Sequence, residues 1–271
     1  MFKILAVTIL VILVLLLLMV LVLFYQQRKF IYFPEKVRTS PAAAGLSNVA
    51  EITLVTPDKH KLIAWYSRAA PGKPTILYFH GNGGSLRSRT ERVMLMQQKG
   101  YGLFMLSYRG YGGSSGSPSE RKIIGDALLA YQWLVDNRVS DRDIILYGES
   151  LGTGVATQVA SLRNAACLIL EAPFTSLPDI ARISFPYLPT RFLMKDQFDS
   201  ARHISKISQP LLILHGSMDT VIPVAYGQQL FDLARSPKSI EVFPFGAHSD
   251  LYLHGAWSKV TEFMEQSCVN Y

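Results

Sequence analysis

The chain has 271 residues, 49% of them hydrophobic, and a formal net charge of +7. The charge does not indicate nucleic-acid binding, because the basic residues are spread along the chain and no zinc signature or basic helix accompanies them. Beyond an N-terminal apolar run, about 240 residues remain, which fits one α/β domain with a single core.

The N-terminal run is apolar or aromatic from residue 4 to residue 25, with Thr8 as the exception. A helix of 22 such residues crosses the bilayer hydrocarbon core, which is about 30 Å thick. A cleaved signal peptide is the alternative, but its apolar region would be shorter and would end in small residues. Here the run ends in Phe24 and Tyr25. We expect residues 1–29 to form a transmembrane anchor with a basic flank, and residues 30–271 to form one folded domain.

Basic residues on the two sides of the run suggest how it is oriented. Lys3 precedes the run, whereas Arg28, Lys29, Lys36 and Arg38 follow it. By the positive-inside bias, this difference favours, by a small margin, a domain that faces the cytoplasm. The same basic group would attract anionic lipid headgroups.

The rest of the chain alternates between strand and helix patterns. Residues 49–55 and 61–67 alternate apolar and polar side chains, as half-exposed strands do. Strands that are apolar throughout, as in a parallel sheet buried on both faces, are predicted at 74–79, 102–108, 143–147, 167–170, 211–214 and 239–243. Helices are predicted at 86–99, 120–137, 151–163, 224–234 and 257–265. This order predicts an α/β fold with a mostly parallel, doubly wound sheet and helices on both faces.

Two positions carry more local predictions. Cys167 lies in an apolar run, where we expect it to pack as a small hydrophobic residue, and Cys268 is expected to be a free thiol. Neither predicts a disulfide framework or an oxidising compartment.

On the helix at 120–137, the residues expected to face the core are Ile124, Ala127, Leu128, Tyr131 and Leu134.

The pattern Gly148-Glu149-Ser150-Leu151-Gly152 follows the predicted strand at 143–147 and precedes a helix. A strand that turns through G-x-S-x-G into a helix is typical of a nucleophile elbow, in which a tight turn exposes the serine hydroxyl at the edge of the sheet. The pentapeptide alone is weak evidence, because an inert serine in a strand-to-helix turn has the same sequence.

Two further side chains complete a candidate triad. Asp219 follows the strand at 211–214 and His248 follows the last strand, so both lie at the same edge of the sheet as Ser150. The order serine, aspartate, histidine matches that of α/β-hydrolases. In such a triad the histidine takes the serine proton and the aspartate holds its tautomer.

Each member of the triad has an alternative. An aspartate after a strand often forms a turn, and a lone histidine is often structural. His254 is the rival base and Glu171 the rival acid. His80 and His215 also follow strands, but each precedes a glycine and is expected to brace its loop.

An oxyanion hole would need two donors near Ser150. We expect one to be the backbone N–H of Leu151 and the other that of Asn82, in the loop after the strand at 74–79. The loss of one such donor raises a reaction barrier by about 2.7–4 kcal/mol.

A substrate pocket and a lid are less sharply predicted. Residues 173–209 hold any lid, and their apolar side chains could line an acyl pocket or pack a helix on the sheet. The glycine-rich loop at 108–116 lacks the phosphate-binding pattern and is expected to be a tight connection. No metal or cofactor is predicted. Candidate pocket residues are Gly81, Gly83, Tyr108, Phe174 and Tyr187.

Five motifs together resemble the α/β-hydrolase-fold serine hydrolases. They are His80-Gly81-Asn82-Gly83, Tyr108-Arg109-Gly110-Tyr111-Gly112, Gly148-Glu149-Ser150-Leu151-Gly152, Glu171-Ala172-Pro173-Phe174 and His215-Gly216-x-x-Asp219. The chain is most similar to the small, membrane-anchored branch with little or no cap, which includes protein-depalmitoylating hydrolases and bacterial relatives.

The resemblance implies that residues 30–271 are a catalytic domain with the α/β-hydrolase fold. It implies hydrolysis of carboxylic esters or thioesters, with lipid or lipidated substrates among the candidates, through an acyl-enzyme on Ser150 and without a cofactor. The alternatives are a peptidase, an amidase or an acyltransferase with the same triad, or a binding protein with a relict triad. The oligomeric state is not predicted.

Overall fold

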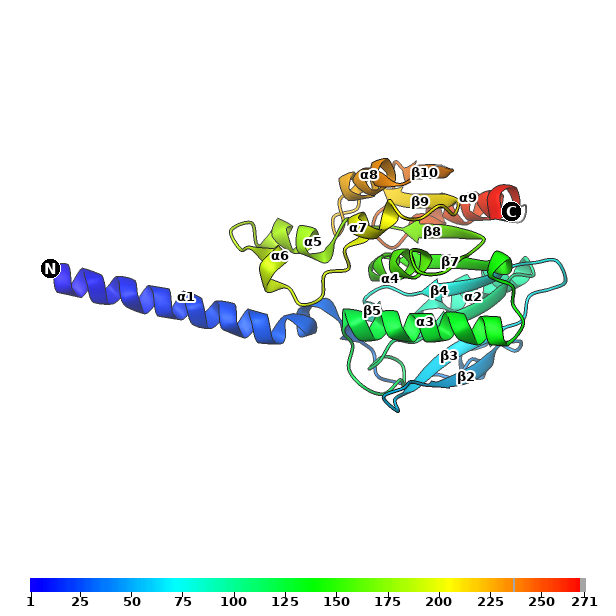
Figure 1. Ribbon diagram of the computed structural model, residues 1–271, viewed down its shortest axis with the longest axis horizontal. Helices are drawn as coiled ribbons and strands as arrows, with labels where there is room; N and C mark the ends of the chain where they lie inside the picture. Colours follow the sequence, from blue (N-terminus) through cyan, green and yellow to red (C-terminus); the bar gives the residue numbers. More distant parts are fainter. Residues whose placement is uncertain (236, 269–271) are drawn as a thin grey trace.

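A long N-terminal helix and a domain built on one large sheet make up the computed structural model, which describes residues 1–235 and 237–268 (Figure 1). The helix, α1 (Phe2–Ile31), projects away from the domain. By length and composition, it is the one helix of the described residues that could cross a membrane, and an apolar stretch of 18 of its residues has a mean hydropathy of 3.6. It continues past residue 29, so the division of the chain at that position stays a prediction.

The sheet has eight strands in the order β10-β9-β8-β7-β4-β6-β3-β2. Strand β3 runs antiparallel to both of its neighbours, β2 and β6. The strands β10, β9, β8, β7, β4 and β6, which follow one another in the sheet, are all parallel. Five of the strands that were predicted to be apolar throughout lie inside the sheet, where both faces are covered, but the sixth, at 239–243, is the edge strand β10 and is largely unburied, so the prediction is wrong there. The bounds are β2 (Ala50–Val55), β3 (Lys61–Ser67), β4 (Thr75–Phe79), β6 (Gly102–Leu106), β7 (Ile144–Glu149), β8 (Cys167–Glu171), β9 (Leu211–Gly216) and β10 (Lys238–Phe243).

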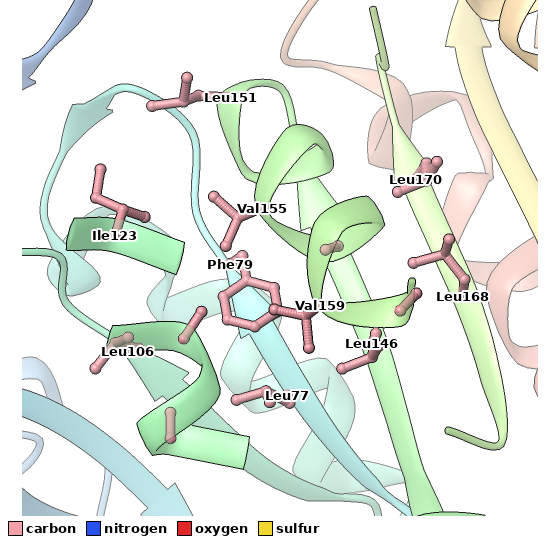
Figure 2. Close-up of a cluster of buried hydrophobic side chains, with 14 of the residues drawn as sticks. Leu77, Phe79, Leu106, Ile123, Leu146, Leu151, Val155, Val159, Leu168 and Leu170 are labelled. Carbon is pink, nitrogen blue, oxygen red and sulfur yellow. The ribbon is translucent and has the colours of Figure 1, made fainter. Parts of the chain in front are cut away.

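Helices cover both faces of the sheet, which confirms the predicted fold class. The core on one face includes side chains of α3 (Glu120–Asp136), α4 (Leu151–Ala160), α7 (Ser200–Ile204) and α8 (Val224–Leu233). Part of this core is shown in Figure 2, where Phe79 of β4 lies beside Val155 and Val159 of α4. The core on the other face includes α2 (Thr90–Gln98) and α9 (Ala256–Phe263). Each fully buried aliphatic or aromatic side chain contributes about 1.5–3 kcal/mol.

Short elements complete the chain. Strands β1 (Phe33–Pro34) and β5 (Gly83–Gly84) pair beside the main sheet. Helices α5 (Leu177–Ser184) and α6 (Thr190–Leu193) lie in the region expected to hold a lid, and we call residues 177–193 the cap segment. The remaining turns are 3₁₀-helices at Ala42–Ala44, Leu86–Arg89, Asp141–Asp143 and Leu251–His254, and a π-helix at Met264–Cys268.

The buried face of α3 differs from the predicted one. Ile124 and Leu128 are only partly buried, whereas Ile123 and Asp126 are buried. The carboxylate of Asp126 accepts two hydrogen bonds of 2.6 Å from the Arg109 guanidinium. Burial raises the pKa of Asp126 above its usual value, although the hydrogen bonds and the positive charge of Arg109 act in the opposite direction. A polar residue therefore lies on the core face because its partner comes from the glycine-rich loop after β6.

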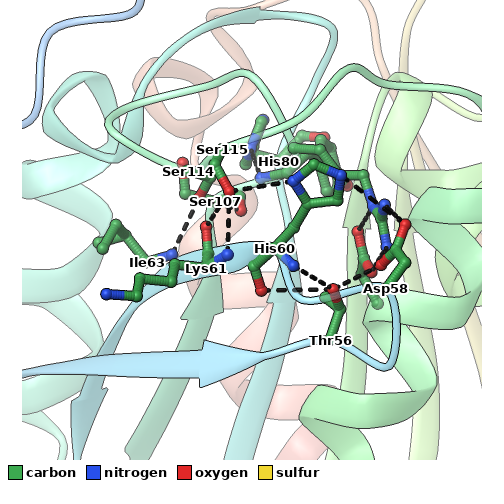
Figure 3. A network of polar contacts seen from close by, with 12 residues as sticks. Thr56, Asp58, His60, Lys61, Ile63, His80, Ser107, Ser114 and Ser115 are labelled. Carbon is green, nitrogen blue, oxygen red and sulfur yellow. Dashed lines mark hydrogen bonds and ion pairs between the residues drawn. The ribbon is translucent and has the colours of Figure 1, made fainter.

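The same loop is tied to the turn between β2 and β3 by further polar contacts (Figure 3). The Ser114 hydroxyl accepts a hydrogen bond of 2.9 Å from the Ile63 amide, and the Ser115 hydroxyl accepts one of 2.9 Å from the Lys61 amide. Arg109 also donates to Asp58 at 2.7 Å. The loop is thus a tight connection, as the sequence predicts, and it joins β6 to α3.

The prediction for the two cysteines is wrong. Cys167 and Cys268 form a disulfide with a Cα–Cα distance of 5.4 Å. Cys167 lies at the start of β8, and the π-helix after α9 brings Cys268 against it. Both side chains are buried. The sequence did not indicate the pair, because the cysteines are 101 residues apart and only the docking of the C-terminal helix joins them.

Loss of the disulfide should destabilise the domain. A cross-link reduces the entropy of the unfolded chain and typically stabilises a protein by about 2–4 kcal/mol. We expect Cys268→Ser to lower the thermal unfolding midpoint of the detergent-solubilised chain by roughly 10 °C, measured by tryptophan fluorescence. A reductant should lower the midpoint of the wild type equally and leave that of the variant unchanged. A wild-type midpoint that does not respond to reductant would contradict a structural disulfide.

Candidate active site

Ser150 lies in the sharp turn between β7 and α4. Its φ of 51° and ψ of −117° are in a region that residues with a side chain rarely adopt. A Cβ on Gly148 would lie 2.4 Å from the Gly152 carbonyl oxygen, and a Cβ on Gly152 would lie 2.0 Å from that of Phe79. Both glycines are therefore required for this close approach of α4 to β4 and β7. The turn has the geometry of a nucleophile elbow.

His248 and Asp219 meet Ser150 at this edge of the sheet. The Nε2 atom of His248 is 2.9 Å from Oγ of Ser150, and its Nδ1 atom is 2.7 Å from Oδ2 of Asp219. The other oxygen of Asp219 accepts hydrogen bonds of 2.8 Å from the amides of Val221 and Ile222. Burial would raise the pKa of Asp219, but hydrogen bonds from His215, His248 and the Ile222 amide hold it below its usual value. The carboxylate is thus kept charged beside the imidazole.

The rival residues lie elsewhere or have other partners. His254 contacts Asp250 at 3.6 Å near the surface. Glu171 is bound to Arg92, as described below. His80 is fully buried, and burial together with the positive charge of Arg89 lowers its pKa to about 3, so that it stays neutral. Its Nδ1 atom is 2.7 Å from the Gly81 carbonyl oxygen, which is consistent with the predicted loop-bracing role.

Two largely buried ion pairs lie next to the nucleophile. Glu149 and Glu171 are adjacent across β7 and β8, and the Glu171 carbonyl oxygen accepts a hydrogen bond from the Ser150 amide. Arg89 contacts Glu149 at 3.0 Å, and Arg92 contacts Glu171 at 2.6 Å. Two neighbouring carboxylates would repel each other, so each is paired with its own arginine.

Tyrosines complete both ion pairs. The Tyr78 hydroxyl donates to Glu149 at 2.6 Å, and the Tyr147 hydroxyl donates to Glu171 at the same distance. Burial would raise the pKa of Glu149, but the arginines and the Tyr78 hydrogen bond lower it to about 2. Sequence reasoning missed both arginines. The available signal was their spacing of three in the predicted helix at 86–99, opposite two glutamates at strand ends.

The two predicted oxyanion donors flank Ser150. Leu151 is the first residue of α4, and its N–H has no partner within the helix. Asn82 lies in the loop after β4, where a Cβ on the neighbouring Gly81 would be 3.5 Å from that of Ser150. The Asn82 carbonyl oxygen accepts hydrogen bonds from the Phe33 amide and the Tyr111 hydroxyl, which hold the Asn82–Gly83 peptide unit next to this donor in place.

A cavity of about 370 Å³ includes Ser150, Leu151 and Asn82 in its wall. Its volume is in the range of small-molecule sites, ~300–1,000 Å³. The wall is mostly apolar and is formed by α1, the cap segment, and the loops after β4, β8 and β9. The arrangement suits a carbonyl group at Ser150 with an apolar chain beside it.

Of the five predicted pocket residues, only Phe174 lies in the described wall of this cavity. Tyr187 is wrongly predicted, because its side chain is 97% exposed at the outer surface of the cap segment. Tyr108 is buried under the loop and donates to the His80 carbonyl oxygen. Gly83 pairs with Phe33 in the small sheet, and Gly81 lies behind Ser150. Because ligands bind beyond the carboxyl ends of parallel strands, the sequence could indicate which loops lie near Ser150. It could not indicate which side chains of these loops point into the cavity.

Comparisons with known proteins identify the family of the chain. A family model described as the alpha/beta hydrolase fold matches residues 74–204. In an alignment 274 positions long, the chain is 34% identical to the alpha/beta hydrolase domain-containing protein WAV2 of Arabidopsis thaliana. The alignment covers 87% of this chain and 89% of that protein. The chain belongs to the α/β-hydrolase family.

Two other similar proteins are a lipase and an esterase by name. Over 201 residues, the chain is 38% identical to the lysophosphatidylserine lipase ABHD12 of Danio rerio, a match that covers 65% of this chain and 51% of that protein. The Pyrococcus furiosus esterase Pf2001 has the same fold, with a TM-score of 0.71 and 21% identity over 88% of this chain and 98% of that one. The prediction of a hydrolase is therefore confirmed, whereas its serine mechanism and its substrate stay predictions.

The ion pair next to Ser150 should make stability depend on pH. Because the pKa of Glu149 is lowered from 4.5 to about 2, its charge stabilises the folded state above pH 4.5, and this contribution is lost as the pH falls toward 2. We expect Glu149→Gln to lower the thermal midpoint by roughly 10 °C at pH 7, since Arg89 is left unpaired. The difference from the wild type should shrink below pH 4.5. Glu91→Gln, at an exposed position of α2, is the control. A difference that is constant from pH 7 to pH 3 would contradict this assignment.

Proposed function

We propose that the protein is a membrane-anchored serine hydrolase that cleaves carboxylic esters or thioesters through an acyl-enzyme on Ser150. The observation that carries the proposal is the continuous contact from Asp219 through His248 to the Ser150 hydroxyl. A serine hydroxyl is a weak nucleophile without such a base. The strained turn and the apolar cavity add support, because they expose the hydroxyl to a space that an acyl group can occupy.

The reaction would proceed in two steps. In the first, His248 accepts the Ser150 proton while Oγ attacks the carbonyl carbon, and the same imidazole then protonates the leaving group. The backbone N–H groups of Leu151 and Asn82 would stabilise the negative charge on the carbonyl oxygen. In the second step, His248 activates water, which releases the acid and restores Ser150. Asp219 stabilises the imidazolium in both steps.

The apolar wall of the cavity favours a substrate with an apolar acyl chain over one with a polar chain. The residues of its wall that come from the cap segment include Leu177, Ile180, Leu188 and Leu193. The lipase ABHD12 is a relative, and its name supports an acyl lipid as the kind of substrate. Ester and thioester carbonyls present the same acyl group to Ser150, so both remain within the proposal, as does a lipidated substrate of the kind that depalmitoylating hydrolases cleave.

Modification of Ser150 tests the proposal directly. We expect a fluorophosphonate to label the detergent-solubilised protein at Ser150, as identified by mass spectrometry of the modified peptide. Ser150→Ala and His248→Ala should abolish labelling, and Asp219→Asn should lower kcat for a p-nitrophenyl ester about 10⁴-fold. Ser258→Ala, at an exposed position, is the matched control. A folded wild type that neither reacts with the probe nor turns over esters would favour a binding protein with a relict triad.

The anchor is part of the proposal, and the disulfide bears on its orientation. Disulfides persist in oxidising compartments and are rare in the cytosol. The Cys167–Cys268 bond therefore favours a domain on the side away from the cytosol, in contrast to the small excess of basic residues after the apolar run.

Protease protection tests the orientation. With inside-out vesicles, whose cytosolic face is outward, we expect added protease to leave the domain intact until detergent is added. Right-side-out vesicles or intact cells are the control, in which the domain should be cleaved without detergent. Cleavage of the domain in intact inside-out vesicles would instead support a domain that faces the cytoplasm.

A further inference from the structure

One face of α1 forms part of the wall of the active-site cavity. Five of the α1 residues that line it, Val20, Leu23, Phe24, Gln27 and Ile31, lie at positions 20, 23/24, 27 and 31, a repeat of three or four that places them on the same side of the helix, and Phe30 also lines it. The opposite wall includes α5, in the cap segment. The residues of α1 that lie on other faces, such as Val22, remain exposed. We call these five residues the α1 stripe.

Polar contacts hold the α1 stripe in place against the domain. Arg28 donates two hydrogen bonds, of 2.9 Å and 3.0 Å, to the carboxylate of Asp196, and the Tyr32 hydroxyl donates a third, of 3.0 Å. Asp196 is only 2% exposed. The Gln27 amide donates to the Leu193 carbonyl oxygen at 3.2 Å and accepts from the Lys195 amide at 2.6 Å. The end of α1 is therefore fixed to the chain that follows the cap segment.

The end of α1 also contacts the loop that carries a candidate oxyanion donor. The side-chain amide of Asn82 donates to the Ile31 carbonyl oxygen at 3.1 Å. The Phe33 amide, just after the helix, donates to the Asn82 carbonyl oxygen at 2.9 Å. The helix that could cross a membrane is thus in direct contact with Asn82, one of the two residues proposed to bind the carbonyl group.

The length of α1 places the α1 stripe near the bilayer surface. Its 30 residues extend about 45 Å, whereas the hydrocarbon core is about 30 Å thick. The apolar run at 4–25 is long enough to cross this core, so the residues of α1 after it emerge, and the α1 stripe extends from the last turns inside the core to the first turns beyond it. The cap segment lies on the same side of the domain as α1 (Figure 1), and it exposes Ile183, Phe185, Tyr187 and Phe192. Exposed aromatic and aliphatic side chains of this kind favour the membrane interface.

We infer that α1 is a wall of the acyl-binding site as well as an anchor, and that the substrate is an amphiphile whose acyl chain comes from the leaflet at which α1 ends. The inference rests on the proposed function of Ser150. The acyl chain would lie between the α1 stripe and the cap segment, while its carbonyl group reaches Ser150 and its polar group remains at the bilayer surface.

Substitutions that narrow the cavity from each side test the inference. We would reconstitute the full chain in nanodiscs and compare kcat/KM for a palmitoyl and an acetyl ester of one fluorogenic alcohol. Leu23→Trp, in the α1 stripe, and Ala181→Trp, in α5, should each lower the ratio of palmitoyl to acetyl turnover about tenfold. Val22→Trp adds the same side chain at a position of α1 that is 59% exposed, and should leave the ratio unchanged.

The outcomes separate this inference from the proposed function. Labelling of Ser150 by a fluorophosphonate in each variant shows that the active site is folded. An unchanged ratio in Leu23→Trp would overturn the inference, and so would a lower ratio in Ala181→Trp alone, because the chain would then contact only the cap segment. Equal losses in Leu23→Trp and Val22→Trp would also overturn it. By contrast, a wild type without ester turnover or Ser150 labelling would reject the proposed function itself.

Discussion

A strand, a helix and a loop approach one another at Ser150 so closely that no side chain fits at Gly148 or Gly152. The rest of the candidate site depends on this close approach. It forces Ser150 into a positive φ and directs the residue to the edge of the sheet where the chain leaves β9 and β10. Asp219 and His248 can reach the hydroxyl because the parallel strands end at that edge. The strain in the turn is maintained by the packing of α4 on β4 and β7.

The surroundings of Ser150 are charged on one side and apolar on the other. Behind it, Glu149 and Glu171 lie in register on adjacent strands, and each is bound by an arginine from the same short helical region. These pairs are poor evidence of net stability, because removing two charges from water is costly, but they restrict the positions of the residues beside Ser150. In front of it the wall is apolar, so a developing negative charge would meet backbone N–H groups rather than a cation.

The sequence was informative where burial or chain order left few alternatives. The central strands could be predicted because they are buried on both faces, and the three residues of the candidate triad because each follows a strand in the expected order. Contacts between distant segments could not be predicted: the Cys167–Cys268 bond depends on the docking of the last helix, and the arginines depend on how α2 lies on the sheet. The role proposed for α1 was also hidden, because a uniformly apolar run does not reveal which face contacts a protein.

The disulfide has a topological consequence for the cap segment. It closes a covalent ring from residue 167 to residue 268, and this ring contains the cap segment, Asp219 and His248, whereas Ser150 and α1 lie outside it. A single cut in the exposed turn between α5 and α6 would therefore leave two fragments that remain covalently joined. The acid and the base would stay linked to the half of the chain that carries the nucleophile, so the protein could lose the continuity of its cap without losing a member of its triad.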